Sequence, residues 1–291
     1  MENNASSFGF IVLMAIVVLV LVGGTKNSNS GLLRSNSSTT PQTRATGATS
    51  SGTGSNGATT KVIEKIPDNQ SPYKGVVKIY SISRSKNPSQ EYVTIKMNSS
   101  TKESVVVTGW TLRSLNTGNA TQIPKATYLY FVGVTNTEEN VVMAPGETMY
   151  LVTGYSPNGM SFKVNECSGY LAQNQSFVPY LSRNCPLPRN EDLSSIPKLT
   201  INDACFDYIE TFSQCKIQKD SLPVYWSGEC NNFIYNKINY PSCVAVHKDD
   251  KDFYGKEWRV YLKRGATLWK DRRESVGLYD NLGKLVDTYS Y

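Results

Sequence analysis

The amino-acid sequence predicts a mainly β protein, an antiparallel β-sandwich interrupted by a cysteine-containing helical insert. Three observations lead to this prediction. Short segments of alternating apolar and polar residues, separated by turn residues, occur on both sides of residues 165–255. All six cysteines lie within that interval. With 291 residues, 39% of them hydrophobic and 11% aromatic, the chain is long enough to form a sizeable core in one or two domains.

The N-terminal segment predicts a membrane anchor. Residues 3–25 contain no charged side chain, and residues 8–22 are almost wholly apolar. A helix over residues 5–24 would be about 30 Å long, which matches the hydrocarbon thickness of a bilayer. We therefore expect a single transmembrane helix within residues 1–24. The alternative is a secretory signal whose cleavage releases the protein, but a positive n-region and a good cleavage site are missing.

Residues 25–72 are expected to form a disordered linker rich in Ser, Thr, Gly, Asn and Ala. Residues 25–61 contain no aromatic residue, and their large apolar residues are Leu32 and Leu33. Such a composition buries too little apolar surface to offset the entropy of ordering the chain. As a random coil, this stretch would hold the following domain roughly 35 Å from the membrane.

The charge distribution argues against a nucleic-acid-binding protein. The net charge is +6, and half of it lies in residues 1–61, so residues 62–291 carry only +3. A region of that size with so small an excess lacks the concentrated basic surface that binds phosphates. The chain also has a single histidine, His247, which excludes every site that needs two imidazoles.

The predicted sandwich is formed by residues 73–164 and 256–291. Turn signals such as Asn116-Thr117-Gly118 separate its strands, and residues 280–283 form the last hairpin turn. The predicted strands are rich in alternating, β-branched or aromatic residues, and they cover residues 77–82, 91–97, 105–113, 128–132, 148–152, 258–263, 275–279 and 285–289. Short strands at this spacing are typical of an antiparallel sandwich.

The insert, residues 165–255, contains two helical patterns. Residues 203–214 place Cys205, Tyr208, Ile209 and Phe212 on one face, after the cap candidates Thr200 and Asn202. Residues 227–238 place Cys230, Phe233, Ile234 and Ile238 on one face, with Ser227 as the cap candidate. The two patterns predict two amphipathic helices within the cysteine-containing region.

Several motifs resemble the lamin tail domain family. Residues 91–95 (EYVTI) and 107–112 (VTGWTL) resemble the family's "E-aromatic-V-x-I … L-x-G-W-x-L" core, residues 143–147 (MAPGE) resemble a turn, and residues 268–287 resemble the closing hairpin. The layout resembles that of membrane-anchored members in reduced-genome bacteria. The resemblance implies an immunoglobulin-like sandwich without catalytic residues, acting as a binding or scaffolding module. The 91-residue insert departs from the domain's own pattern.

Gly109 and Trp110 form the core signature of this resemblance. We interpret Trp110 as a strand tryptophan that fills the core, in preference to a platform for a ligand. Gly109 is interpreted as a bulge or as a place where another chain segment approaches the backbone closely.

The cysteines predict a disulfide framework in an oxidising compartment, because their number is even and their spacing contains no C-x-x-C pair. If residues 203–214 are helical, Cys205 and Cys215 lie up to about 15 Å apart along the axis, too far for a bridge. An antiparallel helix hairpin would bring the start of the first helix to the end of the second. Of the 15 pairings that six cysteines allow, this geometry favours Cys167–Cys185, Cys205–Cys243 and Cys215–Cys230.

No catalytic residue, cofactor or metal ligand is expected. Residues 250–255 (DKDFYG) begin like a calcium loop, but Tyr254 and Tyr261 replace two oxygen ligands, which favours a solvated turn. A hydrolase would depend on His247, which we interpret as an exposed loop residue, and the sequence lacks a G-x-S-x-G elbow. Cysteines in disulfides cannot serve as thiolate nucleophiles.

We therefore expect a non-catalytic binding or scaffolding protein whose domain is displayed at the cell surface. Its expected partner is a protein or glycan of the cell envelope, with exposed aromatic side chains of the insert as anchors. Two alternatives stay open: a secreted hydrolase or its accessory module, and a glycan-binding structural protein. Lys26 and Arg34 follow the apolar segment and favour a cytoplasmic domain. The six confined cysteines favour the extracytoplasmic side.

Overall fold

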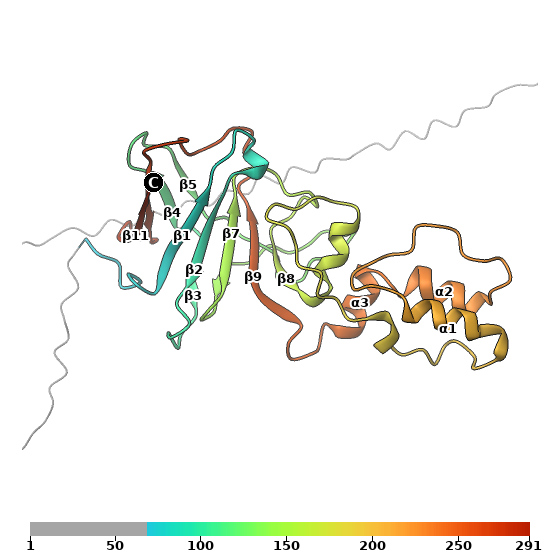
Figure 1. Cartoon of the computed structure of the whole chain (residues 1–291). Coiled ribbons are helices and arrows are strands. Elements are labelled where there is room, and N and C mark those ends of the chain that lie inside the picture. The colour runs from blue at the N-terminus through green and yellow to red at the C-terminus, as the bar shows by residue number, and fades with distance from the viewer. Residues whose placement is uncertain (1–68) are drawn as a thin grey trace, which may run out of the picture. The chain divides into compact units, whose positions relative to one another are not determined.

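The computed structural model describes residues 69–291 and is mainly β, with a helical insert (Figure 1). The expected anchor at residues 1–24 and the linker up to residue 68 lie outside the described residues. Within residues 69–291, no helix is long and apolar enough to cross a membrane. The described chain joins the sheets before the expected boundary at residue 73, because the backbone N–H of Ser71 donates to the carbonyl of Leu285 at 2.9 Å.

The larger sheet has five strands in the order β1-β2-β7-β9-β8. Its strands are β1 (Val77–Ser83), β2 (Tyr92–Met97), β7 (Thr148–Val152), β8 (Phe162–Asn165) and β9 (Tyr254–Tyr261). The pairing of β7 with β9 is parallel, which corrects the purely antiparallel prediction. Parallel neighbours need a long crossover connection. Here the chain between β7 and β9 includes the whole insert, so the connection is long enough.

A four-stranded sheet, in the order β11-β10-β4-β5, forms the second layer. Its strands are β4 (Thr111–Ser114), β5 (Ala120–Gln122), β10 (Ser275–Tyr279) and β11 (Leu285–Ser290), and a small third sheet pairs β3 (Val105–Val106) with β6 (Val142–Met143). The predicted turn at residues 280–283 joins β10 to β11. Its Asp280 carboxylate accepts hydrogen bonds from the backbone N–H groups of Leu282 and Lys284 at 2.9 and 3.0 Å.

One buried apolar cluster lies between the two larger sheets. Ile95 and Leu151 of the five-stranded sheet share it with Leu112 and Leu278 of the four-stranded sheet. Trp110, one residue before β4, is among its largest fully buried side chains. The alternating patterns of the sequence thus supply the inward faces of both sheets.

Gly109 precedes this tryptophan with a positive φ of +84°. A Cβ atom at this position would lie 2.7 Å from the side-chain oxygen of Asn281. The Asn281 amide also donates to the carbonyl of Thr108 at 3.3 Å. The backbone conformation and the close approach of the β10–β11 turn both require glycine here.

The predicted strand at residues 128–132 is wrong. Residues 128–132 form no ladder, and the nearest pairings are isolated bridges just before them, at Ala126 and Thr127. The β-favouring aromatic residues are used for packing instead: the Tyr128 ring meets Trp258 edge-on at 4.8 Å, and Tyr130 is buried against the insert. A high content of aromatic residues indicates a half-buried surface, which does not have to be a strand.

The insert contains three short α-helices, α1 (Asp203–Glu210), α2 (Gly228–Asn236) and α3 (Tyr240–His247). Four 3₁₀ turns complete the regular structure: η1 (Pro88–Gln90) among the strands, and η2 (Glu166–Gln173), η3 (Pro188–Asn190) and η4 (Thr200–Asn202) in the insert. The two predicted helices exist but are shorter than predicted. Ser227 caps α2 by accepting from the backbone N–H of Cys230, whereas the Asn202 side chain donates to the carbonyl of Pro197 and caps nothing.

The third helix, α3, was not predicted. Its start carries a recognisable signal, because Asn239 accepts from the backbone N–H of Ser242 and Pro241 stands in the first turn. Residues 243–246 are all apolar, so the helix has no distinct apolar face in sequence. In the structure Cys243 and Val244 are buried, whereas Ala245 and Val246 are exposed. A search for helical periodicity therefore misses it.

All six cysteines form disulfides, but the predicted pairing is wrong in every bridge. The predicted bridges were Cys167–Cys185, Cys205–Cys243 and Cys215–Cys230. The observed bridges are Cys167–Cys243, Cys185–Cys215 and Cys205–Cys230.

The pairing differs because the two predicted helices do not form the assumed hairpin. Cys205 and Cys230 lie in the first turns of α1 and α2, and their Cα atoms are 6.2 Å apart. The long connection at residues 211–227 allows the chain to return to the first turn of α1 before α2 begins. Cys243 belongs to the separate helix α3, so it is free to meet Cys167 in η2.

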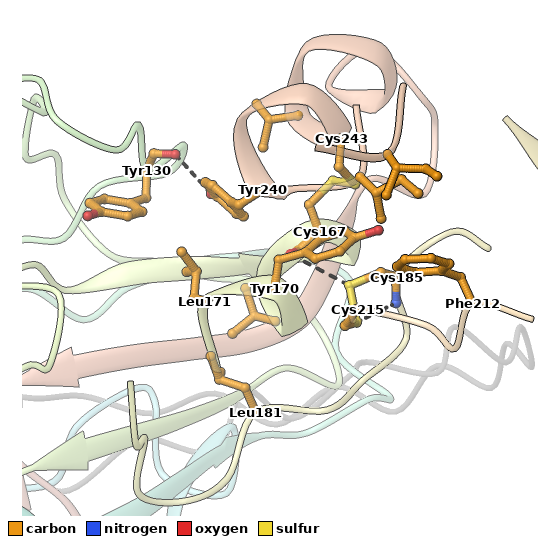
Figure 2. Packing of buried hydrophobic residues seen from close by; sticks show 14 of the residues in the cluster. Tyr130, Cys167, Tyr170, Leu171, Leu181, Cys185, Phe212, Cys215, Tyr240 and Cys243 are labelled. Atoms are coloured by element: carbon orange, nitrogen blue, oxygen red, sulfur yellow. Dashed lines mark hydrogen bonds between the residues drawn. A yellow bond between two sulfur atoms is a disulfide. The ribbon is translucent and has the colours of Figure 1, made fainter. Parts of the chain in front are cut away.

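A second buried cluster joins the insert to the sheets (Figure 2). It combines Phe162 of β8 and Tyr261 of β9 with the helices and all three disulfides. Tyr240 in α3 donates its hydroxyl hydrogen to the carbonyl of Tyr130 at 2.8 Å, a contact that Figure 2 shows. The insert is therefore packed onto the sheets and is not a freely hanging loop.

Candidate functional site

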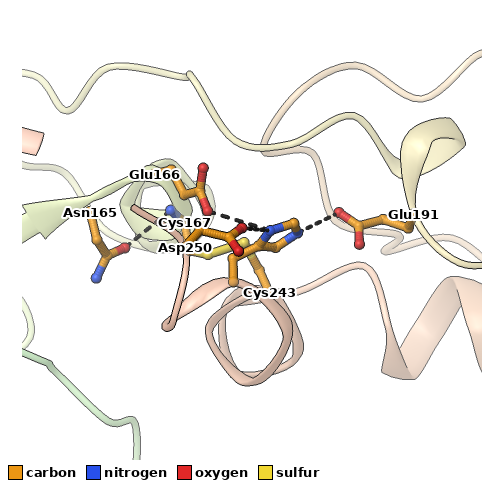
Figure 3. Close-up of polar contacts among 7 residues, drawn as sticks. Asn165, Glu166, Cys167, Glu191, Cys243 and Asp250 are labelled. Atoms are coloured by element: carbon orange, nitrogen blue, oxygen red, sulfur yellow. Dashed lines mark hydrogen bonds and ion pairs between the residues drawn. A yellow bond between two sulfur atoms is a disulfide. The ribbon is translucent and has the colours of Figure 1, made fainter. Parts of the chain in front are cut away.

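The chain's single histidine lies at the centre of a cluster of carboxylates. His247 is the last residue of α3, and its side chain is only 19% exposed, which corrects the prediction of an exposed loop residue. Its Nδ1 lies 2.8 Å from Asp250 Oδ2 and 3.5 Å from Glu166 Oε1. Its Nε2 lies 3.0 Å from Glu191 Oε1. Figure 3 shows Glu166 and Asp250 on one side of the imidazole ring and Glu191 on the other.

Two backbone hydrogen bonds and one disulfide hold the Nδ1 side of this cluster in place. Asp250 follows the end of α3 in a turn, because its backbone N–H donates to the carbonyl of His247 at 2.9 Å. Glu166 begins η2, and its N–H donates to the carbonyl of Phe253 at 2.9 Å. The Cys167–Cys243 disulfide links η2 to α3 one residue from Glu166 and one helical turn from His247.

Glu191 reaches the ring from a different part of the insert. It follows η3, whose last turn it closes by donating its backbone N–H to the carbonyl of Pro188 at 3.2 Å. Its side chain is 23% exposed. The carboxylates thus approach His247 from three separate segments.

The electrostatics of the cluster favour a positive charge on or beside the ring. Burial lowers the pKa of His247, but the hydrogen bonds to Asp250 and Glu191, together with the charges of Glu191 and Glu166, raise it above its ordinary value overall. Burial raises the pKa of the Glu166 carboxyl, against the lowering effect of His247. Three carboxylates around one imidazole form a site that a cation stabilises.

A hollow of about 220 Å³ lies beside the cluster and shares Glu191 with it. Its walls also include Tyr170, Phe233, Lys237 and Val246. Burial, with a further contribution from the negative charge of Glu191, raises the pKa of Tyr170 to about 12. Tyr170, which lines the hollow, therefore stays neutral to a higher pH than an exposed tyrosine.

The buried charges of the sheets have structural partners. Glu91, the first residue of the EYVTI motif, is fully buried and accepts hydrogen bonds from the Thr153 hydroxyl and from the backbone N–H groups of Leu268 and Trp269 at 2.6, 2.8 and 3.1 Å. Lys163 and Glu147 form a buried ion pair. Burial lowers the pKa of Lys163, and the bond to Glu147 opposes this. These groups hold strands and loops together.

The structure brings together residues that the sequence pattern leaves far apart. Among the described residues, the donor atoms of Glu166, His247 and Asp250 all lie within 4.8 Å of one another. Asp250 belongs to the stretch that resembles a calcium loop, but the remaining acidic residue of that stretch, Asp252, is not part of the group. Glu166 and Glu191 carry no local signal, because only the tertiary fold places them beside the histidine.

No protein-family model and no curated protein sequence matches this chain. The resemblance to the lamin tail domain therefore rests on the motifs quoted above. The function has to be inferred from the residues and their geometry.

Proposed function

We propose that this protein is a non-catalytic, extracytoplasmic binding protein that contacts a partner protein through its insert. In this proposal the N-terminal apolar segment anchors the chain in the membrane, and the two sheets form an immunoglobulin-like platform of the lamin tail type. Three disulfides support the extracytoplasmic location, because such bridges persist in oxidising compartments.

The observation that carries the proposal is a pair of exposed apolar side chains on an anchored loop. Val224 and Tyr225, between α1 and α2, are 99% and 70% exposed. The next residue, Trp226, is buried, and its ring packs on Tyr208 at a centroid distance of 5.2 Å. Aromatic side chains that are held in place lose little entropy on binding and are enriched at interface hot spots.

A second anchor fixes the other side of this loop. The hydroxyl of Tyr235 in α2 donates to the carbonyl of Asp220 at 3.0 Å and accepts from the backbone N–H of Leu222 at 3.1 Å. Val224 and Tyr225 are therefore presented between two fixed points. This arrangement suits a preformed contact surface.

The surroundings of the histidine support a non-catalytic function. Both ring nitrogens of His247 face carboxylates, so neither nitrogen activates a serine, threonine or cysteine nucleophile. All six cysteines are in disulfides. The hydrolase alternative thus lacks a nucleophile–base pair around the one histidine.

The test is site-specific photo-crosslinking on living cells, with a benzophenone amino acid in place of Tyr225. The matched control carries the same probe in place of Tyr155, which is 61% exposed and lies outside the insert. We expect one protein adduct from position 225 that is absent from position 155 and is lost in the Val224→Asp variant. Equal labelling at both positions, or adducts with envelope glycan alone, would reject the proposal.

A further inference from the structure

We propose that Glu166, His247 and Asp250 bind a divalent transition-metal ion, zinc in particular, with Glu191 as the carboxylate that positions the histidine. The proposal concerns a separate site from Val224 and Tyr225 and does not depend on the proposed binding function. It assigns a ligand to the one cluster of metal-ligating side chains that converges within residues 69–291.

The spacing of the donor atoms fits a small cation. Nδ1 of His247 lies 2.8 Å from Asp250 Oδ2 and 3.5 Å from Glu166 Oε1, and all three donors lie within 4.8 Å of one another. Zinc bonds to nitrogen and oxygen are about 2.0–2.1 Å, so tetrahedral ligands lie about 3.3 Å apart. Separations of at most 4.8 Å have to close by up to about 1.5 Å to reach this value, which two side chains moving toward each other can supply.

The contact between Glu191 and Nε2 is a separate observation that points to the same ligand. A metal-binding histidine usually donates its second ring N–H to a carboxylate, which fixes the tautomer and increases the basicity of the other nitrogen. The distance of 3.0 Å from Nε2 to Glu191 Oε1 allows this bond. With the proton on Nε2, the lone pair of Nδ1 faces Asp250 and Glu166.

The Glu166 carboxylate is incompletely satisfied by the described residues. Its Oε1 atom is buried and receives no hydrogen bond from them, although it lies 3.5 Å from Nδ1. Nδ1 can carry only one proton, and Asp250 at 2.8 Å is its nearer acceptor. This proton therefore cannot form equally good hydrogen bonds to Asp250 and Glu166. A metal ion contacts Nδ1 and both oxygens at the same time.

The scaffold of the site and its donor types favour a transition metal over calcium. The Cys167–Cys243 disulfide ties the segment of Glu166 to the helix that carries His247, so these two ligands start close together. Imidazole is a good ligand for zinc, copper and nickel, whereas calcium selects oxygen ligands. Three protein ligands leave a fourth position for water or for a side chain of a bound partner.

The first experiment is isothermal titration of the full chain in detergent, with its disulfides intact, using zinc chloride and calcium chloride as separate probes. We expect one equivalent of zinc to bind and calcium to bind at least tenfold more weakly. His247→Gln and Asp250→Asn should each weaken zinc binding at least tenfold, and Glu191→Gln about tenfold. The control is Asp252→Asn, an exposed carboxylate in the same turn, which should leave the affinity unchanged.

A second readout identifies the ligating atom. Because the chain has one histidine, selective ¹⁵N labelling gives one pair of imidazole signals. We expect zinc to shift the Nδ1 signal strongly and to leave the proton on Nε2. Zinc binding that persists in His247→Gln, that shifts Nε2 in place of Nδ1, or that is absent in the folded wild-type chain would overturn the proposal. A circular dichroism spectrum of each variant checks that it folds.

Discussion

The two regions of this protein are stabilised in different ways. In the sheets, alternating strands bury a shared apolar cluster, and no cysteine lies in them. In the insert, the α-helices are only eight or nine residues long. Helices of that length are marginal by themselves. Disulfides tie α1 to α2 and α3 to η2, and the third bridge joins two loops at Cys185 and Cys215. Disulfides therefore provide part of the stability of the insert, whereas strand pairing stabilises the sheets.

The buried polar groups of the two regions differ in a similar way. Glu91 in the sheets has three hydrogen-bond donors, which leaves little capacity for a ligand. Glu166 in the insert keeps a buried oxygen without a donor from the described residues. Glu91 therefore serves the fold, whereas one oxygen of Glu166 is left without a donor from the described residues.

The largest expected effect comes from removing the disulfide at the base of the insert. The Cys167→Ser/Cys243→Ser double variant opens a bridge with a sequence separation of 76 residues. The loss of this constraint should reduce the free energy of unfolding by about 4 kcal/mol. Hydrogen exchange should show loss of protection in α3 and η2 but not in β1 and β2. Equal loss in both regions would show that the insert and the sheets unfold as one unit.

A somewhat smaller effect is expected from Glu91→Gln in the sheets. The amide nitrogen of glutamine cannot accept a hydrogen bond, so at least one of the donors Thr153, Leu268 and Trp269 loses its partner. We expect a loss of about 2–3 kcal/mol in urea unfolding. The control is Glu103→Gln. Because Glu103 is exposed, this variant should change the free energy of unfolding by no more than about 0.5 kcal/mol. A similar stability of the two variants would argue against the Glu91 network.

The contact between the two regions predicts a smaller effect. Tyr240→Phe removes a hydroxyl that donates to the carbonyl of Tyr130 and accepts from the side-chain amide of Asn165. Both partners lose a buried hydrogen bond, so we expect a loss of about 1–2 kcal/mol. The measurement is urea unfolding monitored separately in the insert and in the sheets. If this contact couples the two regions, its removal should move their two unfolding transitions apart. Transitions that stay coincident would show that the regions remain coupled without it.

The smallest predicted effect is a pH dependence above pH 10. The pKa of Tyr170 is raised from 10 to about 12, first by burial and then by Glu191. Above pH 10 the unfolded chain ionises this tyrosine while the folded chain keeps it neutral, so its contribution to stability is lost as the pH rises toward 12. At pH 11 the loss should be on the order of 1 kcal/mol. Tyr170→Phe should reduce this alkaline loss, whereas Tyr80→Phe, at an exposed position, should not.

Local sequence was sufficient to predict five of the eleven described strands closely. The period of two predicts β1, β2 and β7 closely, and the turn that begins at Asp280 places β10 and β11 on either side of it. The parallel pairing of β7 with β9 could not be predicted this way, because it depends on where the chain returns after the insert. Local periodicity specifies which side of a strand is buried but not its neighbour.

The insert was predicted less well for a related reason. The disulfide pairing depends on tertiary positions, and the assumed helix hairpin gave the wrong neighbours for Cys205 and Cys215. The cluster around His247 joins residues as far apart as Glu166 and Asp250, which no local motif connects. Asn239 and Pro241 are a helix-start signal that is visible in the sequence, and this signal places Cys243 on a helix of its own.

The entry and exit of the insert are neighbours in one ladder. Asn165 at the end of β8 lies opposite Tyr254 at the start of β9, and the N–H of Glu166 donates to the carbonyl of Phe253. The chain thus leaves the sheet and returns to it at the same rung, so β8 and β9 are paired as in a hairpin whose turn has been extended by the insert. The insert therefore begins and ends at one point of the sheet, and its buried cluster packs against Phe162 and Tyr261 of the two strands that it connects.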